Sequence, residues 1–90
     1  MTETRDITIK RLRMRSMRRG IKEMDLILTN FADASLSLMS DEDLALYDRL
    51  LSENDHDIYG WVGGQFPPPA RYTALIARIA DMAQGVTRPQ

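Results

Sequence analysis

The sequence has no cysteine and only one histidine, His56, in 90 residues. Without cysteine there is no disulfide, no thiolate zinc site and no thiol nucleophile, so the fold must be stable without covalent cross-links. No apolar run approaches the roughly 20 residues that cross a bilayer, and the N-terminus lacks the apolar stretch of a secretory signal. We therefore expect a protein with no membrane span, from the bacterial cytoplasm or, in a eukaryote, the mitochondrial matrix.

Patterns that carry chemistry are equally scarce. His56 sits in a polar turn and is best interpreted as a solvated residue near a helix start. The acids around it lack the glycine and terminal glutamate of a calcium loop, and Gly63-Gly64 is too short for a dinucleotide fingerprint. We expect no catalytic residue, no metal ion and no cofactor bound stably by this chain, so an independent enzyme is the least favoured class.

Charge is distributed unevenly, although the net charge is only -1. Residues 1–22 carry +6 and residues 23–90 carry -7. Such a split favours a charged partner: nucleic acid, an acidic protein surface or the molecule's own acidic half. A basic nucleic-acid-binding helix and a general adaptor therefore remain as alternatives. The basic segment lacks the interleaved aromatic residues of single-strand binders and a recognisable recognition helix, so we expect no nucleic-acid partner.

Apolar periodicity predicts an all-α fold, a compact bundle of about five short helices in one domain over residues 1–84, followed by a flexible tail at 85–90. No window alternates like a strand. The first basic helix should span about residues 7–18, although Ile7 and Ile9 alternate with polar residues and allow a few extended positions. The second helix should span about residues 20–38, with its core stripe from Ile21 to Ser35. A third helix should follow the N-cap Ser40, and a short fourth helix should run from Asn54 or Asp55 to Gly63-Gly64. The last helix should span 70–83, after Pro67-Pro68-Pro69.

One segment does not fit a purely structural pattern. At about 100° per residue, a helix starting at Gly20 places Arg19, Glu23 and Leu26 together, on the side away from the core stripe. The structural alternative is that Arg19 and Glu23 form an i,i+4 pair, but such a pair contributes only ~0.2–0.5 kcal/mol. Leu26 places an apolar group among charges, and Gly20 lets another backbone approach. The segment therefore predicts a partner-binding site formed by Arg18, Arg19, Gly20, Glu23, Asp25 and Leu26.

The same segment carries a resemblance to a known family. Arg18-Arg19-Gly20-x-x-Glu23-x-Asp25-Leu26, then Phe31, the packing residues Leu44, Tyr47, Leu50 and Leu51, and Asp55-x-Asp57-Ile58-x-x-Trp61 resemble the SdhE family. These proteins are the FAD assembly, or flavinylation, factors of succinate dehydrogenase. The chain departs from the family pattern at Met14, where an aromatic residue is frequent, and at His56, where proline is frequent.

The resemblance implies a monomeric helical accessory protein that is not itself an enzyme. Its partner would be the flavoprotein subunit of succinate dehydrogenase, and often that of fumarate reductase. The family promotes covalent attachment of FAD to a histidine of that subunit, so FAD is the cofactor of the partner. The binding signature of the family corresponds to Arg19, Gly20 and Glu23, whereas Phe31 and Trp61 are expected in the core.

Overall fold

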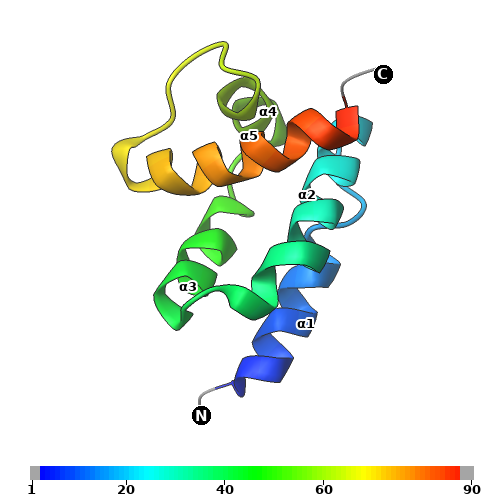
Figure 1. Ribbon diagram of the computed structural model, residues 1–90, viewed down its shortest axis with the longest axis vertical. Helices are drawn as coiled ribbons and strands as arrows, with labels where there is room; N and C mark the ends of the chain where they lie inside the picture. Colours follow the sequence, from blue (N-terminus) through cyan, green and yellow to red (C-terminus); the bar gives the residue numbers. More distant parts are fainter. Residues whose placement is uncertain (1–2, 88–90) are drawn as a thin grey trace.

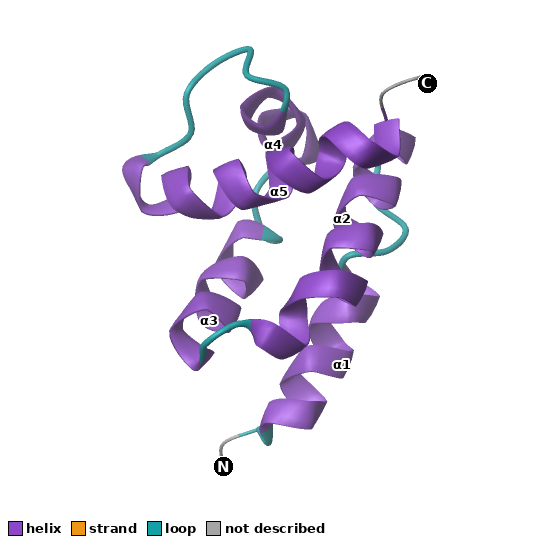
Figure 2. Ribbon diagram, viewed as in Figure 1, coloured by secondary structure: helices purple, strands orange, loops and turns teal. Residues whose placement is uncertain are grey.

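A computed structural model describes residues 3–87 of the chain. Every regular element in this range is helical (Figure 2), which confirms the all-α bundle of five short helices. The structure is 41 × 28 × 22 Å along its principal axes. In chain order the elements are α1 (Arg5–Arg15), α2 (Lys22–Ser35), the 3-10 turn η1 (Leu36–Leu38), α3 (Asp41–Leu50), α4 (Asp55–Val62), the 3-10 turn η2 (Ala70–Tyr72) and α5 (Thr73–Thr87).

The helices pack around α2, which contacts both the first and the last helix (Figure 1). α1 contacts α2 and α3, and a loop of six residues, 16–21, joins it to α2. α5 runs across α2 and α4, and the contact between α2 and α5 is the most extensive in the structure. Of the expected tail, residues 85–87 belong to the end of α5, and residues 88–90 lie outside the described residues.

Side-chain caps start three of the helices. Thr4 Oγ1 accepts a hydrogen bond from the Ile7 amide at 3.3 Å, so α1 begins at Arg5 and the extended positions allowed at Ile7 and Ile9 are wrong. Ser40 Oγ accepts from the Asp43 amide, which confirms the predicted start of α3. Asn54 caps α4 in the same way. These bonds satisfy amides that the first helical turn leaves without partners.

The second helix differs from its predicted range at both ends. Ile21 has extended backbone angles (φ -115°, ψ 125°), so α2 begins at Lys22 and Gly20 lies in the loop. The α-helix ends at Ser35, and η1 carries the fully buried Leu36 into the core. Ile27, which the predicted stripe omitted, is also buried. The stripe identified the buried side of α2, but the helix itself is shorter.

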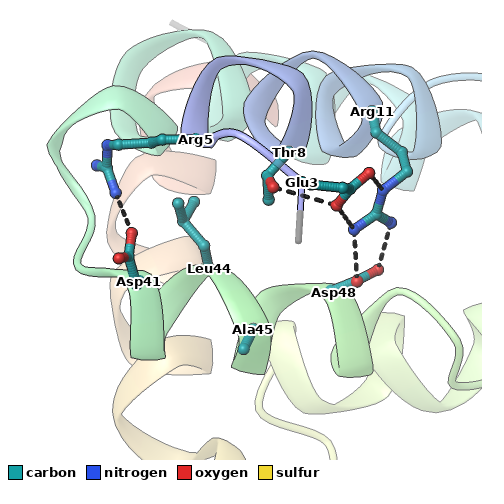
Figure 3. A pocket seen from close by; sticks show the side chains of 8 residues that line it. All are labelled: Glu3, Arg5, Thr8, Arg11, Asp41, Leu44, Ala45 and Asp48. Carbon is teal, nitrogen blue, oxygen red and sulfur yellow. Dashed lines mark hydrogen bonds and ion pairs between the residues drawn. The ribbon is translucent and has the colours of Figure 1, made fainter. Parts of the chain in front are cut away.

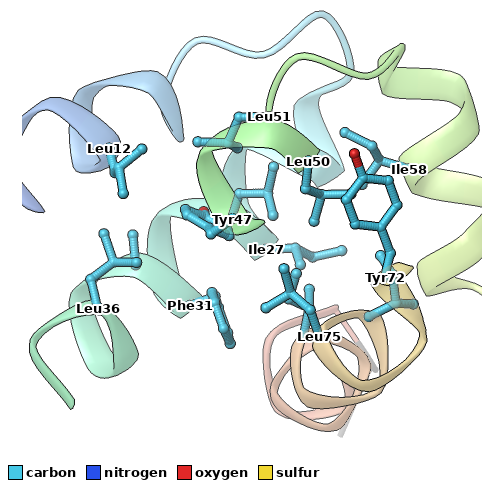
Figure 4. Close-up of a cluster of buried hydrophobic side chains, with 14 of the residues drawn as sticks. Leu12, Ile27, Phe31, Leu36, Tyr47, Leu50, Leu51, Ile58, Tyr72 and Leu75 are labelled. Carbon is cyan, nitrogen blue, oxygen red and sulfur yellow. The ribbon is translucent and has the colours of Figure 1, made fainter. Parts of the chain in front are cut away.

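The core combines side chains from all five helices (Figure 4). Phe31 and Tyr47 pack with ring centroids 5.5 Å apart, which confirms Phe31 as a core residue. The Tyr47 hydroxyl lies 2.6 Å from Ser16 Oγ, and both residues are buried, so each satisfies the other. Burial raises the pKa of Tyr47 to about 12. Trp61 is partly buried and packs on Tyr72 with centroids 5.9 Å apart.

The connection between α4 and α5 folds back onto α4. Gly63 ends the helix and Gly64 has φ +77°, the left-handed conformation that glycine adopts without strain, which confirms the predicted stop. Phe66 then places its ring over the buried Gly60. A Cβ atom at position 60 would lie 2.3 Å from Phe66 Cζ, so this packing requires glycine.

Candidate partner-binding site

The loop between α1 and α2 contains the first of the predicted site residues. Arg18 has φ +57°, a left-handed conformation that is costly for a residue with a side chain, so its surroundings must hold it there. Its side chain is exposed and forms no hydrogen bond or ion pair with another described residue. Arg18 is therefore presented to solvent by a loop that is held in place by its neighbours.

Arg19 supplies much of that hold. Its guanidinium donates to Asp55 Oδ1 from Nε at 2.9 Å and from Nη2 at 2.7 Å. It also donates to the backbone oxygens of Arg15 at 2.9 Å and Leu51 at 3.0 Å. Only 12% of the Arg19 side chain is exposed. Arg19 thus ties the end of α1 to the end of α3 and the start of α4, and most of its donors are used within the fold.

Gly20 is bound by the second oxygen of the same carboxylate. Its amide donates to Asp55 Oδ2 at 2.6 Å. A Cβ atom at position 20 would lie 3.1 Å from that oxygen, closer than ordinary van der Waals contact. Glycine therefore has an intramolecular reason at this position, because it allows the carboxylate to reach the backbone.

Glu23 lies in the first turn of α2 and remains exposed. The Tyr59 hydroxyl of α4 donates to Glu23 Oε2 at 2.7 Å. Glu23 and Arg19 therefore do not pair with each other, because Glu23 bonds to Tyr59 and Arg19 bonds to Asp55, both on α4. This hydrogen bond raises the pKa of Tyr59. A carboxylate has about four acceptor positions, so Glu23 is oriented by Tyr59 and keeps capacity for a donor from another molecule.

Asp25 and Leu26 face a shallow groove along the outer side of α2. The Asp25 carboxylate accepts a hydrogen bond from Thr29 at 3.3 Å, one turn further along the helix. Leu26 is 52% exposed, although it is large and apolar. The groove has a volume of about 400 Å³ and is lined by Lys22, Asp25, Leu26, Thr29, Asn30 and Asp33.

These contacts form one surface and, beneath it, one shielded ion pair that holds the loop. Asp55 and Tyr59 are four residues apart, so they share a side of α4; one binds the loop and the other binds α2. We call the exposed residues Arg18, Gly20, Glu23 and Leu26, together with the half-buried Tyr59, the docking face. Arg19 lies below it with Asp55. Sequence reasoning assigned no role in the site to Asp55 or Tyr59, although the Asp-x-Asp pattern gave a signal for Asp55.

Most of the basic charge near the N-terminus is matched inside the molecule. In the hollow of about 330 Å³ between α1 and α3, Arg5 and Arg11 turn toward carboxylates (Figure 3). Hydrogen bonding from Arg11 lowers the pKa of Asp48. Five of the eight basic residues in 1–22 form ion pairs: Arg5 with Asp41, Arg11 with Glu3 and Asp48, Arg13 with Asp33, Arg15 with Asp48, and Arg19 with Asp55.

The described part of the chain holds neither a cluster of metal-ligating side chains nor a membrane-spanning helix. Within residues 3–87, no three His, Asp or Glu side chains are grouped so that they could hold a metal ion. No helix in this range is long and apolar enough to cross a membrane. His56, the sole histidine, is exposed in the first turn of α4.

Comparison with known proteins gives a consistent set of matches. A family model described as "Flavinator of succinate dehydrogenase" matches residues 10–83. Three curated proteins named succinate dehydrogenase assembly factor 2, mitochondrial, are similar. That of Aspergillus flavus is 55% identical over 58 residues, 64% of this chain and 20% of that protein. That of Komagataella phaffii is 37% identical over 86 residues, 90% and 45% respectively. That of Schizosaccharomyces pombe is 41% identical over 70 residues, 78% and 50%. The chain thus spans about a fifth to a half of these relatives.

Proposed function

Because this chain belongs to the family of succinate dehydrogenase flavinators, we propose that it binds the flavoprotein subunit of succinate dehydrogenase and promotes covalent attachment of FAD to that subunit. The relatives are named assembly factors, in agreement with an accessory role rather than a catalytic one. The family match over residues 10–83 is the observation that carries the proposal.

The structure of the docking face also supports the proposal. It presents an oriented carboxylate at Glu23, an exposed apolar group at Leu26 and an arginine, Arg18, without an intramolecular partner. Arginine is enriched at contact sites between proteins, and an exposed apolar side chain adds surface that a partner can bury. Arg19 and Asp55 act from below, because they fix the loop from which these groups project.

The protein assists without touching the reacting bond. Covalent flavinylation requires the target histidine of the subunit and the flavin to meet in a near-attack arrangement. A helper that binds the competent conformation of the subunit more tightly than its other conformations raises the population of the competent one. FAD then stays with the flavoprotein, and this chain binds no cofactor stably. The flavoprotein of fumarate reductase is a second client, and the complex contains one copy of this chain.

A reconstitution experiment tests the proposal. Apo-flavoprotein and FAD are mixed with and without the protein, and covalent flavin is read by in-gel fluorescence after denaturation. We expect a higher rate or yield when the protein is present. Equal rates and equal yields in both mixtures would remove the assigned function. The same assay with the fumarate reductase flavoprotein tests the second client.

A matched pair of variants connects the assay to the docking face. Glu23→Ala removes the oriented carboxylate, whereas Glu42→Ala removes an exposed acid from the first turn of α3. Both changes remove one negative charge from a helix N-terminus, so they cost a similar helix-dipole contribution, and Glu23→Ala also loses the hydrogen bond to Tyr59. We expect flavinylation to be lost with the first variant and retained with the second.

A further inference from the structure

The side of α1 that faces away from the core carries two large apolar residues. Ile7 is 55% exposed and Met14 is 69% exposed. At about 100° per residue they lie within roughly 20° of each other around the helix, and Met14 lies roughly 160° from Leu12. Leu12 is the buried residue of this helix. The packing of α1 against the bundle therefore does not explain either apolar side chain.

A groove of about 480 Å³ follows this side of the helix and is lined by Ile7, Lys10, Arg11, Met14 and Arg15. Arg11 and Arg15 direct their guanidinium groups sideways to Asp48 on α3. Their methylene stems are consequently left along the groove as apolar surface. The groove is thus apolar although three of its five lining residues are cationic.

The positive charge of the groove that no carboxylate matches is that of Lys10. None of the lining residues is acidic, and Arg11 and Arg15 are paired with Glu3 and Asp48 outside the groove. Lys10 is exposed and forms no hydrogen bond or ion pair with another described residue. A group that complements this surface combines an apolar side chain for the groove with a carboxylate for Lys10.

The groove and the docking face are connected along the chain by a further exposed apolar residue. Met17, 42% exposed, follows Met14 in the chain and precedes Arg18. We infer that the outer side of α1 is a second contact for the flavoprotein subunit, and that it takes an apolar side chain flanked by a carboxylate from an amphipathic segment of that subunit. This inference rests on the proposed function, since it assumes the same partner.

An anionic lipid surface is the competing occupant for a basic helix with exposed apolar groups. The structure favours a protein segment, because carboxylates of the same chain neutralise Arg11 and Arg15 and hold them sideways. Ile7 and Met14 are the two large apolar residues that line the groove. Two such side chains offer little apolar area for insertion into a bilayer.

Affinity for the apo-flavoprotein, measured by calorimetry with the full chain, tests the inference. Met14→Glu should weaken binding roughly 10- to 100-fold, because a buried apolar contact is lost and a charge is placed against the partner's carboxylate. Met14→Lys should weaken binding less, because only the apolar contact is lost. Leu38→Glu is the control, since Leu38 is 81% exposed and does not line the groove. It should bind within about twofold of wild type.

The outcomes are separable from those of the proposed function. If wild-type protein neither binds nor flavinylates the subunit, the proposed function fails and the inference fails with it. If wild type is active and Met14→Glu binds equally well, the inference alone is overturned. Equal losses for Met14→Lys and Met14→Glu overturn the acidic character of the partner segment. Unchanged melting temperatures exclude unfolding as the cause of any loss.

Vesicle sedimentation tests whether the outer side of α1 binds a protein segment or a lipid surface. Wild type and Met14→Glu are sedimented with phosphatidylcholine vesicles, with and without phosphatidylglycerol. We expect both proteins to remain in the supernatant. Sedimentation of wild type with the anionic vesicles, lost in Met14→Glu while its affinity for the flavoprotein is unchanged, would assign the surface to lipid and overturn the inference.

Discussion

Two polar bridges join the segment around the start of α2 to α4, and they differ in exposure. Arg19 with Asp55 and Glu23 with Tyr59 are each 36 residues apart in the chain. The first bridge is shielded, with 12% of Arg19 and 19% of Asp55 exposed. The second lies at the surface. Neighbouring residues of one sequence motif therefore have different roles in the structure: the shielded bridge holds the loop, and the exposed one orients the Glu23 carboxylate.

The largest effect is expected from Asp55→Ala. Removing this carboxylate leaves the Arg19 guanidinium and the Gly20 amide without their acceptor. Loss of one partner from a shielded pair costs about 3–5 kcal/mol when burial is complete, and we expect about 2–3 kcal/mol here because the site is partly exposed. Urea denaturation measures the free energy of unfolding, and flavinylation should also fall.

Asp57→Ala is the matched control for that change. Asp57 is an exposed acid two residues further along the first turn of α4, and it forms no hydrogen bond or ion pair with another described residue. Its loss should cost at most about 0.5–1 kcal/mol through the helix dipole. Equal destabilisation by the two variants would show that the shielded bridge contributes nothing specific to stability.

Gly20→Ala should have the next largest effect, about 1 kcal/mol, because its Cβ would push Asp55 Oδ2 from 3.1 Å. The penalty should shrink when Asp55→Ala is already present, since the obstructing oxygen is gone. A double-mutant cycle by urea denaturation measures this coupling. Additive penalties would show that the glycine is required for another reason, such as close approach of the partner.

Glu23→Ala tests the exposed bridge between Glu23 and Tyr59. The surface hydrogen bond to Tyr59 contributes about 0.5–1 kcal/mol, so the melting temperature should fall by only a few degrees. Flavinylation should nevertheless be lost. Tyr59→Phe should give an intermediate activity, because the carboxylate remains but loses its orienting donor. Unfolding of Glu23→Ala would place Glu23 with the shielded bridge instead.

The smallest effect concerns acid pH. Arg11 lowers the pKa of Asp48 in the folded state from its ordinary value of 3.8. A lowered pKa means that the ionised carboxylate contributes stability above about pH 4, and that this contribution is lost as the pH falls through the folded value. Asp48→Asn should therefore flatten the decline in melting temperature below about pH 4. An unchanged decline would show that the ion pairs of Asp48 with Arg11 and Arg15 contribute nothing to stability.

Local signals in the sequence predicted most of the fold. The Ser40 cap, the Gly63-Gly64 stop and the apolar spacing of the last helix act over a few residues, so they could be interpreted without knowledge of the rest of the chain. The start of α2 could not. Gly20 and Ile21 leave the helix where Arg19 and Gly20 bind Asp55, a residue 35 or 36 positions away. Helical periodicity carries no information about such a contact.

The candidate site was predictable to a similar extent. Glu23 and Leu26 were selected as surface groups and are exposed, whereas Arg19 was placed on the same surface and is largely enclosed. Tyr59 was missed because its hydroxyl reaches Glu23 only after α4 docks beside α2. The role of these residues in partner binding stays a prediction.

The ring of Phe66 resting on Gly60 has an evolutionary consequence. The Phe66 ring occupies the space that a side chain at position 60 would need. In divergent relatives, a methyl or larger group at 60 should therefore accompany a smaller residue at 66. Covariation of side-chain size at these two sites would therefore show which related chains keep this conformation of the connection between α4 and α5.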